Sequence, residues 1–304
     1  MSSNTLIPLL TLLISNVATA QNSDFWVVST TQPPPTQQNS NNVCVSGLKE
    51  KLKFYDAQIS ELKNQLHATR KELLSLVEKE VEHSLLTPED CKDVLGRGYK
   101  TSGMYKIKPM YSAKEFWVWC DLTTKGGGWT YIFNRFDGSE SFYRNWTDYR
   151  DGFGYLSTEF WIGLEHLHHL TNSRNCEVLF ELVDWDMKKV YAKYNNFVIG
   201  SEEEGYALKS LGTFEGTAGD SLTGHLKMKF TTADRDQDIR KEYNCAVFNK
   251  GAWWYNSCYY SHLTGEYVHV KPSTGKNVNK INWNTFRGYD YSLKQVRMMV
   301  RPKD

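Results

Sequence analysis

Three aspartates stand at alternate positions, Asp234, Asp236 and Asp238, in a stretch that continues into aromatic residues. Carboxylate oxygens clustered within one short loop are the ligands that a hard cation such as calcium requires. The loop is not an EF-hand, because the sixth and twelfth positions counted from Asp234 hold Ile239 and Cys245 instead of glycine and glutamate. Most acidic runs are solvated loops. Calcium binding is therefore a hypothesis that the neighbouring residues must support.

Two cysteines flank the aromatic run that follows. Cys245 and Cys258 lie on either side of Gly-Ala-Trp-Trp-Tyr at 251–255. If they pair, the disulfide fixes both ends of this segment and holds the acidic loop beside it. The spacing thus favours a small, loop-rich binding region in which metal and aromatic surface are neighbours.

Motifs of catalysis are missing from the sequence. It contains no Gly-x-Ser-x-Gly nucleophile elbow, and the run at 165–169 (EHLHH) matches neither zinc-protease pattern. His168 and His169 would face different ways on a helix, which disfavours a shared metal. We expect no enzyme activity. The net charge of +1 also argues against a nucleic-acid partner bound through phosphate contacts.

The first 45 residues predict export followed by a flexible arm. An apolar run at 6–17 precedes Ala18-Thr19-Ala20, a small-x-small cleavage signature, so residues 1–20 are predicted to be a signal peptide. The run is too short to span a bilayer and is interrupted by Pro8. Residues 21–45 are polar and contain three successive prolines, which predicts a disordered linker. We expect a secreted protein of the extracellular space, without membrane insertion.

A helical pattern occupies residues 46–85. Residues of a mainly apolar seam recur four and three apart, as in the a and d positions of a coiled coil: Leu48, Leu52, Tyr55, Ile59, Leu62, Leu66, Thr69, Leu73 and Leu76. We expect a homo-oligomer, with a trimer as our interpretation; a single amphipathic helix lying on the globular domain is the alternative. Cys44, just before this segment, is typical of an interchain disulfide, and a free thiol is the alternative.

Three long blocks carry a family resemblance. Residues 125–171, 234–267 and 283–302 together resemble the fibrinogen C-terminal (fibrinogen-related) domain family across about 88–304. The resemblance implies an α+β fold, with mixed small subdomains around a twisted antiparallel sheet and a loop-rich calcium and ligand subdomain. The predicted coiled coil precedes this domain.

The resemblance also implies disulfides and a metal site. It pairs Cys91 with Cys120 and Cys245 with Cys258. Cys176 is then left over, either as a buried thiol or as a partner of Cys44 in another chain.

For calcium, the resemblance implies side-chain ligands at Asp236 and Asp238 and backbone carbonyls at about Arg240 and Glu242. Asp234 would lie outside the first layer of ligands. The ion would stiffen the loop and so link ligand affinity to calcium.

In lectins of the family, a pocket beside the second disulfide binds acetyl groups. Here it would comprise Ser257, Cys258, Tyr259, Tyr255 and Asn249, with a cis peptide between Ser257 and Cys258. Tyr259 stands where those lectins have histidine, and Asn249 where they have an aromatic residue. Tyrosine rings still offer stacking surfaces and hydroxyl groups to a ligand.

Two functions follow from the resemblance. The first is a calcium-stabilised, oligomeric lectin of innate-immune type that binds a glycan or acetylated ligand and gains avidity through the coiled coil. The alternative is a signalling or matrix protein of angiopoietin-like or tenascin-like type that binds a cell-surface or matrix protein. Of the two, the sequence favours the lectin. Asn145-Trp146-Thr147 is in addition the N-glycosylation acceptor of the chain.

Overall fold

The computed structural model describes residues 38–269 and 280–303, and the side chains of 38–44, 80 and 82–86 are not described. The chain divides into two units, residues 1–75 and 76–304. The predicted signal peptide, most of the predicted linker and the side chain of Cys44 lie outside the described part. Among the described residues, no helix is both long and apolar enough to cross a membrane.

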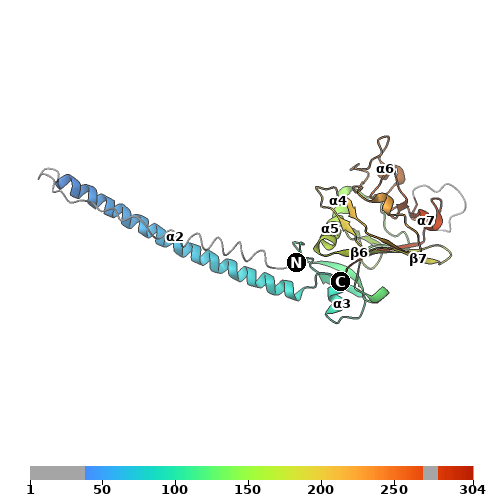
Figure 1. The fold of residues 1–304 in the computed structure, drawn as a ribbon, viewed down its shortest axis with the longest axis horizontal. Helices are drawn as coiled ribbons and strands as arrows, with labels where there is room; N and C mark the ends of the chain where they lie inside the picture. Colours follow the sequence, from blue (N-terminus) through green and yellow to red (C-terminus); the bar gives the residue numbers. More distant parts are fainter. Residues whose placement is uncertain (1–37, 270–279, 304) are drawn as a thin grey trace. The chain divides into compact units, whose positions relative to one another are not determined.

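One long helix, α2, runs from Gln38 to Leu86 (Figure 1). It begins earlier than predicted, so residues 38–45 of the expected disordered linker are helical. The chain has no proline between Pro35 and Pro88, and its single glycine in that stretch, Gly47, costs a helix only about 1 kcal/mol relative to alanine. The predicted seam is exposed along α2, with Leu52 64% and Leu66 69% accessible. A row of exposed leucines in register is the arrangement that a coiled coil buries.

The second unit is built on an antiparallel sheet with the strand order β1-β2-β3-β13-β6-β7-β10. Two short strands extend it, because β4 pairs with β5 and β5 pairs with β3. The strands are β1 (Gly103–Ile107), β2 (Phe116–Asp121), β3 (Trp129–Arg135), β4 (Phe153–Gly154), β5 (Phe160–Trp161), β6 (Cys176–Val183), β7 (Lys189–Tyr194), β10 (Phe214–Gly216) and β13 (Gln295–Pro302).

Short elements complete this unit. Two small antiparallel pairs join β8 with β9 and β11 with β12. Their bounds are β8 (Val198–Ile199), β9 (Leu208–Ser210), β11 (Ser261–His262) and β12 (Asn282–Trp283). The helices are α3 (Cys91–Gly96), α4 (Trp146–Asp151), α5 (Leu164–Ser173), α6 (Cys245–Asn249) and α7 (Asn284–Arg287), with 3₁₀ turns at Thr124–Gly126 and Thr223–His225. The predicted α+β fold is confirmed.

The last strand holds the sheet together. β13 pairs with β3 on one side and with β6 on the other, although more than 110 residues separate it from β6 in the chain. Its Val296 and Met298 are fully buried, whereas Arg297 between them is exposed. Because burial alternates with a period of two residues, one face of the sheet packs on the core and the other faces solvent.

The disulfide between Cys91 and Cys120 ties α3 to β2, with the two Cα atoms 5.3 Å apart. Cys176, at the start of β6, is 1% exposed and unpaired. Burial raises the pKa of its thiol to about 12. Of the two interpretations of Cys176, the structure therefore favours the buried thiol, because a bond to another chain would require the sulfur at the surface.

The helix predicted over 165–169 is α5, and its histidines do not form a metal site. His166 stacks on Phe116 at 3.8 Å between ring centroids, and His168 Nδ1 lies 3.0 Å from the carbonyl oxygen of Ile199. His169 instead faces Glu165 at 3.5 Å. The three rings thus have three different neighbours, as their spacing on a helix requires.

Candidate functional site

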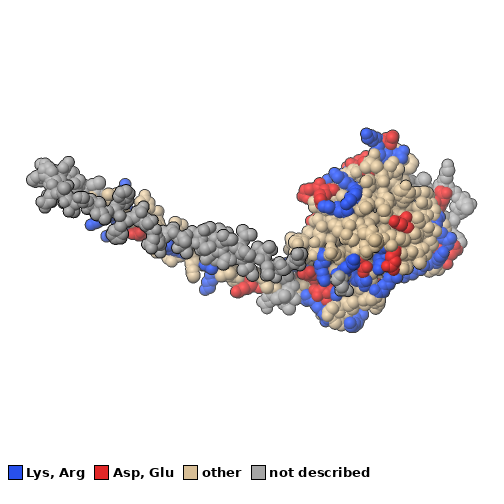
Figure 2. All heavy atoms as spheres, viewed as in Figure 1, with Lys and Arg blue, Asp and Glu red and all other residues tan. Residues whose placement is uncertain are grey.

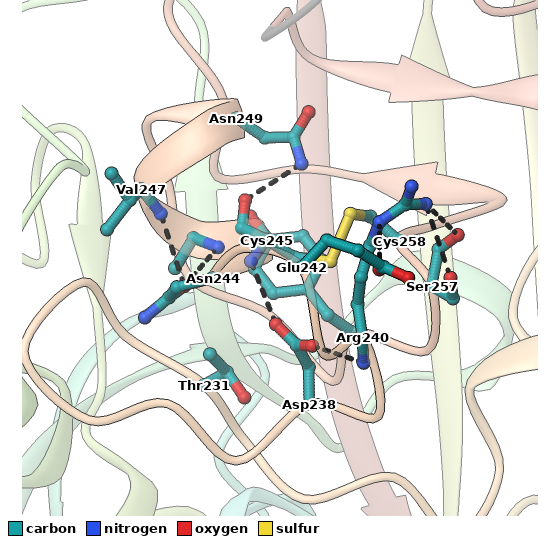
Figure 3. The surroundings of a disulfide bond; sticks show 12 residues. Thr231, Asp238, Arg240, Glu242, Asn244, Cys245, Val247, Asn249, Ser257 and Cys258 are labelled. Atoms are coloured by element: carbon teal, nitrogen blue, oxygen red, sulfur yellow. Dashed lines mark hydrogen bonds and ion pairs between the residues drawn. A yellow bond between two sulfur atoms is a disulfide. The ribbon is translucent and has the colours of Figure 1, made fainter.

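A one-and-a-half-turn helix begins the loop-rich region around the second disulfide. Asn244 caps α6, because its Oδ1 accepts hydrogen bonds from the N–H groups of Ala246 and Val247 at 2.6 and 3.2 Å. The first residue of the helix, Cys245, is bonded to Cys258 with a Cα–Cα distance of 5.6 Å (Figure 3). The disulfide thus joins the end of the acidic loop to the segment that follows the aromatic run.

Asp238 connects the acidic loop to this disulfide. Its Oδ2 accepts the N–H of Cys245 at 2.8 Å, and its Oδ1 accepts the N–H of Arg240 at 2.7 Å (Figure 3). Burial raises the pKa of Asp238, and the Asp236 carboxylate raises it further, while the two N–H groups act in the opposite direction. Two neighbouring carboxylates, one of them half-buried, form a negative site that a cation would stabilise.

The three aspartates have separate roles. Asp236 lies next to Asp238, whose N–H donates to Asp236 Oδ1 at 3.3 Å. Asp234 instead faces α4, where its carboxylate accepts the N–H of Trp146 at 2.9 Å and the hydroxyl of Thr232 at 2.7 Å. Asp234 thus fastens the loop, and Asp236 and Asp238 remain as the oxygen pair.

The donor set fits a hard cation only with help from the main chain. The described residues contain no group of three or more His, Cys, Asp or Glu side chains arranged around one point. Calcium takes six to eight oxygen ligands, including backbone carbonyls, and an oxygen that accepts one N–H can still coordinate a cation. Asp236 and Asp238 would supply the side-chain oxygens, with the carbonyls of Arg240 and Glu242 as the predicted remainder.

Arg240 bridges the acidic loop to the segment before Cys258. Its Nη1 lies 3.4 Å from the hydroxyl and 3.5 Å from the carbonyl oxygen of Ser257 (Figure 3). Its Nε lies 3.3 Å from Glu242, and its guanidinium covers the ring of Tyr243 at 4.4 Å. A change in the acidic loop would therefore reach Ser257 directly.

A cleft of about 220 Å³ lies next to the disulfide, and the peptide bond between Ser257 and Cys258 is cis. We call this cleft the tyrosine cleft. Its lining residues are Asn256, Ser257, Cys258, Tyr259, Tyr260 and Tyr289. Tyr259 stacks on His262 with ring centroids 4.9 Å apart, and the ring of Tyr289 lies 6.1 Å from that of Tyr259. Tyr260 and Tyr289 are 50% and 44% exposed, so their rings are available to a ligand.

A buried histidine supports the floor of the tyrosine cleft. His225 Nδ1 bonds to the carbonyl oxygen of Trp254 at 2.7 Å, while its Nε2 accepts the N–H groups of Tyr260 and Ser261 at 3.1 and 3.2 Å. This pattern requires neutral imidazole with the proton on Nδ1. Burial lowers the pKa of His225 to about 4, in agreement with that state.

Two residues predicted to bind ligand do not face the tyrosine cleft. Tyr255 is fully buried, and its hydroxyl lies 2.8 Å from His262 Nε2. Asn249 is 3% exposed, and its amide donates to the carbonyl oxygen of Cys245 within α6. Both expectations are corrected, because each side chain is held by a partner inside the protein.

Sequence reasoning missed Tyr289, Asn256 and His225. Tyr289 enters from a segment 30 residues downstream of Tyr259. Asn256 turns the chain, since its N–H donates to the Cys258 carbonyl oxygen at 2.8 Å and its side-chain amide to Gly224 at 3.0 Å. His225 lies in a glycine-containing turn, and nothing in that local sequence signals that its ring will contact the residues of the cleft.

A larger cavity, of about 430 Å³, lies between Arg135 and Tyr267. The guanidinium of Arg135 is bonded to the carbonyl oxygen of Gly265 and faces Glu159 at 3.9 Å. Its lining includes His269, the last residue described before the gap at 270–279. We therefore assign no ligand to it.

Comparison with known proteins agrees with this architecture. Residues 87–303 match the family model described as fibrinogen beta and gamma chains, C-terminal globular domain. Fibrinogen-like protein 1 of Bos taurus is 42% identical over 277 residues, which cover 84% of this chain and 86% of that protein. Angiopoietin-related protein 1 of Homo sapiens is 44% identical over 216 residues, 71% of this chain and 44% of that protein.

Solved structures show the same fold. The fibrinogen-like globe domain of human ANGPTL2 superposes with a TM-score of 0.69 at 43% identity, covering 71% of this chain and all of that chain. A lamprey fibrin D-dimer, complexed with the peptide ligand Gly-His-Arg-Pro-amide, superposes with a TM-score of 0.68 at 31% identity, covering 89% of this chain and 96% of that chain. The chain thus belongs to the family of proteins with a fibrinogen C-terminal globular domain.

Proposed function

We propose that this protein is a secreted, oligomeric ligand whose fibrinogen-like domain binds a protein on a cell surface or in the extracellular matrix. The observation that carries the proposal is the tyrosine cleft, in which exposed Tyr260 and Tyr289 flank Tyr259. Tyrosine is enriched where proteins bind proteins, because it combines a large apolar ring with a hydroxyl group. The action is binding alone, without catalysis.

The similar proteins support the same choice. The relatives include fibrinogen-like and angiopoietin-related proteins, and the lamprey relative was solved with a peptide ligand. The sequence alone favours the lectin; with the structure, we place the lectin second. Asn249 turns away from the tyrosine cleft, and Tyr259 occupies the position of the family lectins' histidine. An acetylated glycan remains the second candidate, favoured by the cleft's small size and aromatic lining.

Binding of the full-length protein to cultured cells would decide between these ligands. The relevant signal is the part of the binding that Tyr289→Ala removes. We expect trypsin treatment of the cells to abolish this part and treatment with peptide-N-glycosidase to leave at least four fifths of it. If the glycosidase removed it and acetylated amino sugars competed for it, the lectin would be the correct function.

We propose further that α2 makes the protein an oligomer, with three chains as the expected number. The exposed row of leucines along α2 supports this, because isolated helices seldom leave such a row in water. Cys44 would then join chains covalently. Light scattering of the purified protein with and without reductant measures the number of chains, and a monomer in both conditions would refute the coiled coil.

Calcium is proposed as the stabilising ion of the acidic loop, on the strength of the Asp236–Asp238 pair. At a calcium concentration 100 times its Kd, the ion should raise the melting temperature by about 5–10 °C. The double variant Asp236→Ala/Asp238→Ala should lose this rise. Differential scanning calorimetry with calcium and with chelator measures it, and exposed Asp290→Ala is the matched control. An unchanged rise in the double variant would exclude this placement.

Glycosylation of Asn145 is also proposed, because this side chain is exposed. Asn145 also caps α4, since its Oδ1 accepts the N–H of Asp148 at 2.9 Å. Thr147→Ala should remove the glycan, measured as lost mass, and leave the cap. Asn145→Gln should remove both the glycan and the cap. It should therefore lower the free energy of unfolding by about 1 kcal/mol more than Thr147→Ala does. A Thr147→Ala mass that differs from that of the parent, expressed in secretory cells, only by the substituted side chain would show that the site is unused.

A further inference from the structure

A second groove lies on the solvent-facing side of the main sheet. Two adjoining cavities, of about 340 and 190 Å³, share Gln295 and Arg297 of β13. None of their lining residues lines the tyrosine cleft. We call the two cavities together the sheet groove. The larger cavity alone falls within the range of roughly 300–1,000 Å³ that is typical of ligand pockets.

One end of the sheet groove is aromatic and aliphatic. The lining residues there are Trp119 of β2, Tyr131 of β3, Phe136 and Leu156. Trp119 is partly exposed, and Trp117, two residues earlier on the same strand, is 57% exposed. Side chains two apart on a strand share a face, so Trp117 adds a second indole to the face of β2 that carries Trp119. Such a surface can stack against the C–H face of a sugar ring.

The middle of the sheet groove carries planar polar groups. The amide of Asn134 donates to the carbonyl oxygen of Thr158 at 2.8 Å, whereas its Oδ1, within the described part of the chain, has no hydrogen-bond partner. Gln295 and Ser157 line the same cavity. A buried acceptor left unpaired is unfavourable unless a ligand or water donates to it. Sugar hydroxyl groups are donors of the required kind.

The other end of the sheet groove is cationic. Glu181 is buried between Lys189, at 2.7 Å, and Arg297, at 3.8 Å. One carboxylate therefore faces two cations, and the shorter contact belongs to Lys189. Arg297 is 44% exposed, so its guanidinium can form a two-point contact with a ligand carboxylate. Figure 2 shows further Lys and Arg side chains, with Asp and Glu side chains among them, along the side of the domain where β6 and β7 lie in Figure 1.

We propose that the sheet groove binds a carboxylated oligosaccharide. The aromatic end would stack on one sugar ring, the amides would bond to its hydroxyl groups, and Arg297 would hold the carboxylate of a neighbouring uronic or sialic acid unit. The charge of the cationic end is complementary to such a ligand. A protein partner is the competing occupant, and the experiments below distinguish it from the oligosaccharide.

Isothermal titration of the full-length protein tests the proposal with defined probes. Hyaluronan hexasaccharide and 3′-sialyllactose carry a carboxylate on a uronic acid and on a sialic acid, respectively, and so distinguish the two sources. The N-acetylglucosamine hexamer and lactose are their neutral counterparts. We expect at least one acidic probe to bind at least tenfold more tightly than its neutral counterpart, and the affinity to fall as salt is raised.

Two variants locate the binding. Arg297→Gln should weaken binding of the acidic probe at least tenfold. Lys193→Gln is the matched control, since Lys193 lies on the same face, pairs with buried Glu177 at 3.7 Å and lines neither cavity. It should change affinity less than twofold, and Tyr259→Ala in the tyrosine cleft should also have no effect. Equal binding by Arg297→Gln and the parent would overturn the proposal.

A protein partner is the competing outcome. If neither acidic probe bound at 1 mM, and Arg297→Gln lost binding to cells from which sialidase and hyaluronidase had removed carboxylated sugars, the sheet groove would be a protein interface and the assignment would be wrong. Circular dichroism of Arg297→Gln checks in each case that the variant is folded. Because Tyr289→Ala reports on the tyrosine cleft and Arg297→Gln on the sheet groove, failure of one proposal is distinguishable from failure of the other.

Discussion

Replacing Glu159 with alanine is expected to lower the free energy of unfolding of the fibrinogen-like domain by about 3–5 kcal/mol. Glu159 is fully buried and faces the guanidinium of Arg135, which is itself 2% exposed. Its two carboxylate oxygens accept four backbone N–H groups, those of Phe136, Asp137, Gly138 and Glu140. The variant would leave a buried cation and these donors without their partner, which is the most destabilising way to break an ion pair.

Urea denaturation of the purified variants measures this loss. Glu159→Gln keeps one carbonyl acceptor and loses the charge, so it should fall between Glu159→Ala and the parent. Glu203→Ala, at an exposed position, is the control and should change the free energy by less than about 0.5 kcal/mol. If Glu159→Ala proves too unstable to purify, the prediction is tested by the free energy of unfolding that Glu159→Gln loses relative to the parent. A Glu159→Gln variant as stable as Glu203→Ala would contradict the prediction.

Acid is expected to destabilise the same domain through its buried histidines. Burial lowers the pKa of His225 to about 4 and that of His262 to about 3. Both are neutral in the folded and unfolded chain at pH 7 and above. As the pH falls below 6.5 the unfolded chain binds protons that the folded chain does not, so stability is lost down to the folded pKa. For His225 alone the loss at pH 4 is roughly 3 kcal/mol.

The contacts of His225 explain why protonation would be so unfavourable. Its Nε2 accepts two backbone N–H groups, from Tyr260 and Ser261, and a proton on Nε2 would face both. Urea midpoints at pH 7, 5 and 4 measure the effect. His225→Gln should be less stable at pH 7 and have a shallower pH dependence, whereas exposed His67→Gln should retain the parental slope. If the stability of His225→Gln and that of the parent depended equally on pH, His225 would not be responsible for the loss of stability in acid.

The same titration would affect the tyrosine cleft. The N–H groups that His225 holds belong to Tyr260, which lines the cleft, and to its neighbour Ser261. His262, the other low-pKa histidine, stacks on Tyr259. Because the folded protein keeps His225 neutral down to about pH 4, binding through the cleft should be retained to that pH and weaken below it.

Local patterns in the sequence determined the local features of this protein. The four-three spacing of leucines predicted the helix that the structure contains, because helix formation depends on residues within a few turns. The helix ends at Leu86, directly before Thr87 and Pro88, because proline disfavours the helical conformation of the residue that precedes it. The long motifs predicted the domain, and with it the two disulfides Cys91–Cys120 and Cys245–Cys258.

The tertiary structure alone decided which residues share a site. Tyr255 and Tyr259 are four residues apart in one aromatic run, yet the first is buried against His262 and the second lines the tyrosine cleft. Tyr289 reaches that cleft from a distant segment, and β13 brings Arg297 beside Tyr131. These contacts join residues 30 to 166 positions apart. No short-range pattern encodes them, because burial and strand pairing are properties of the whole packed chain.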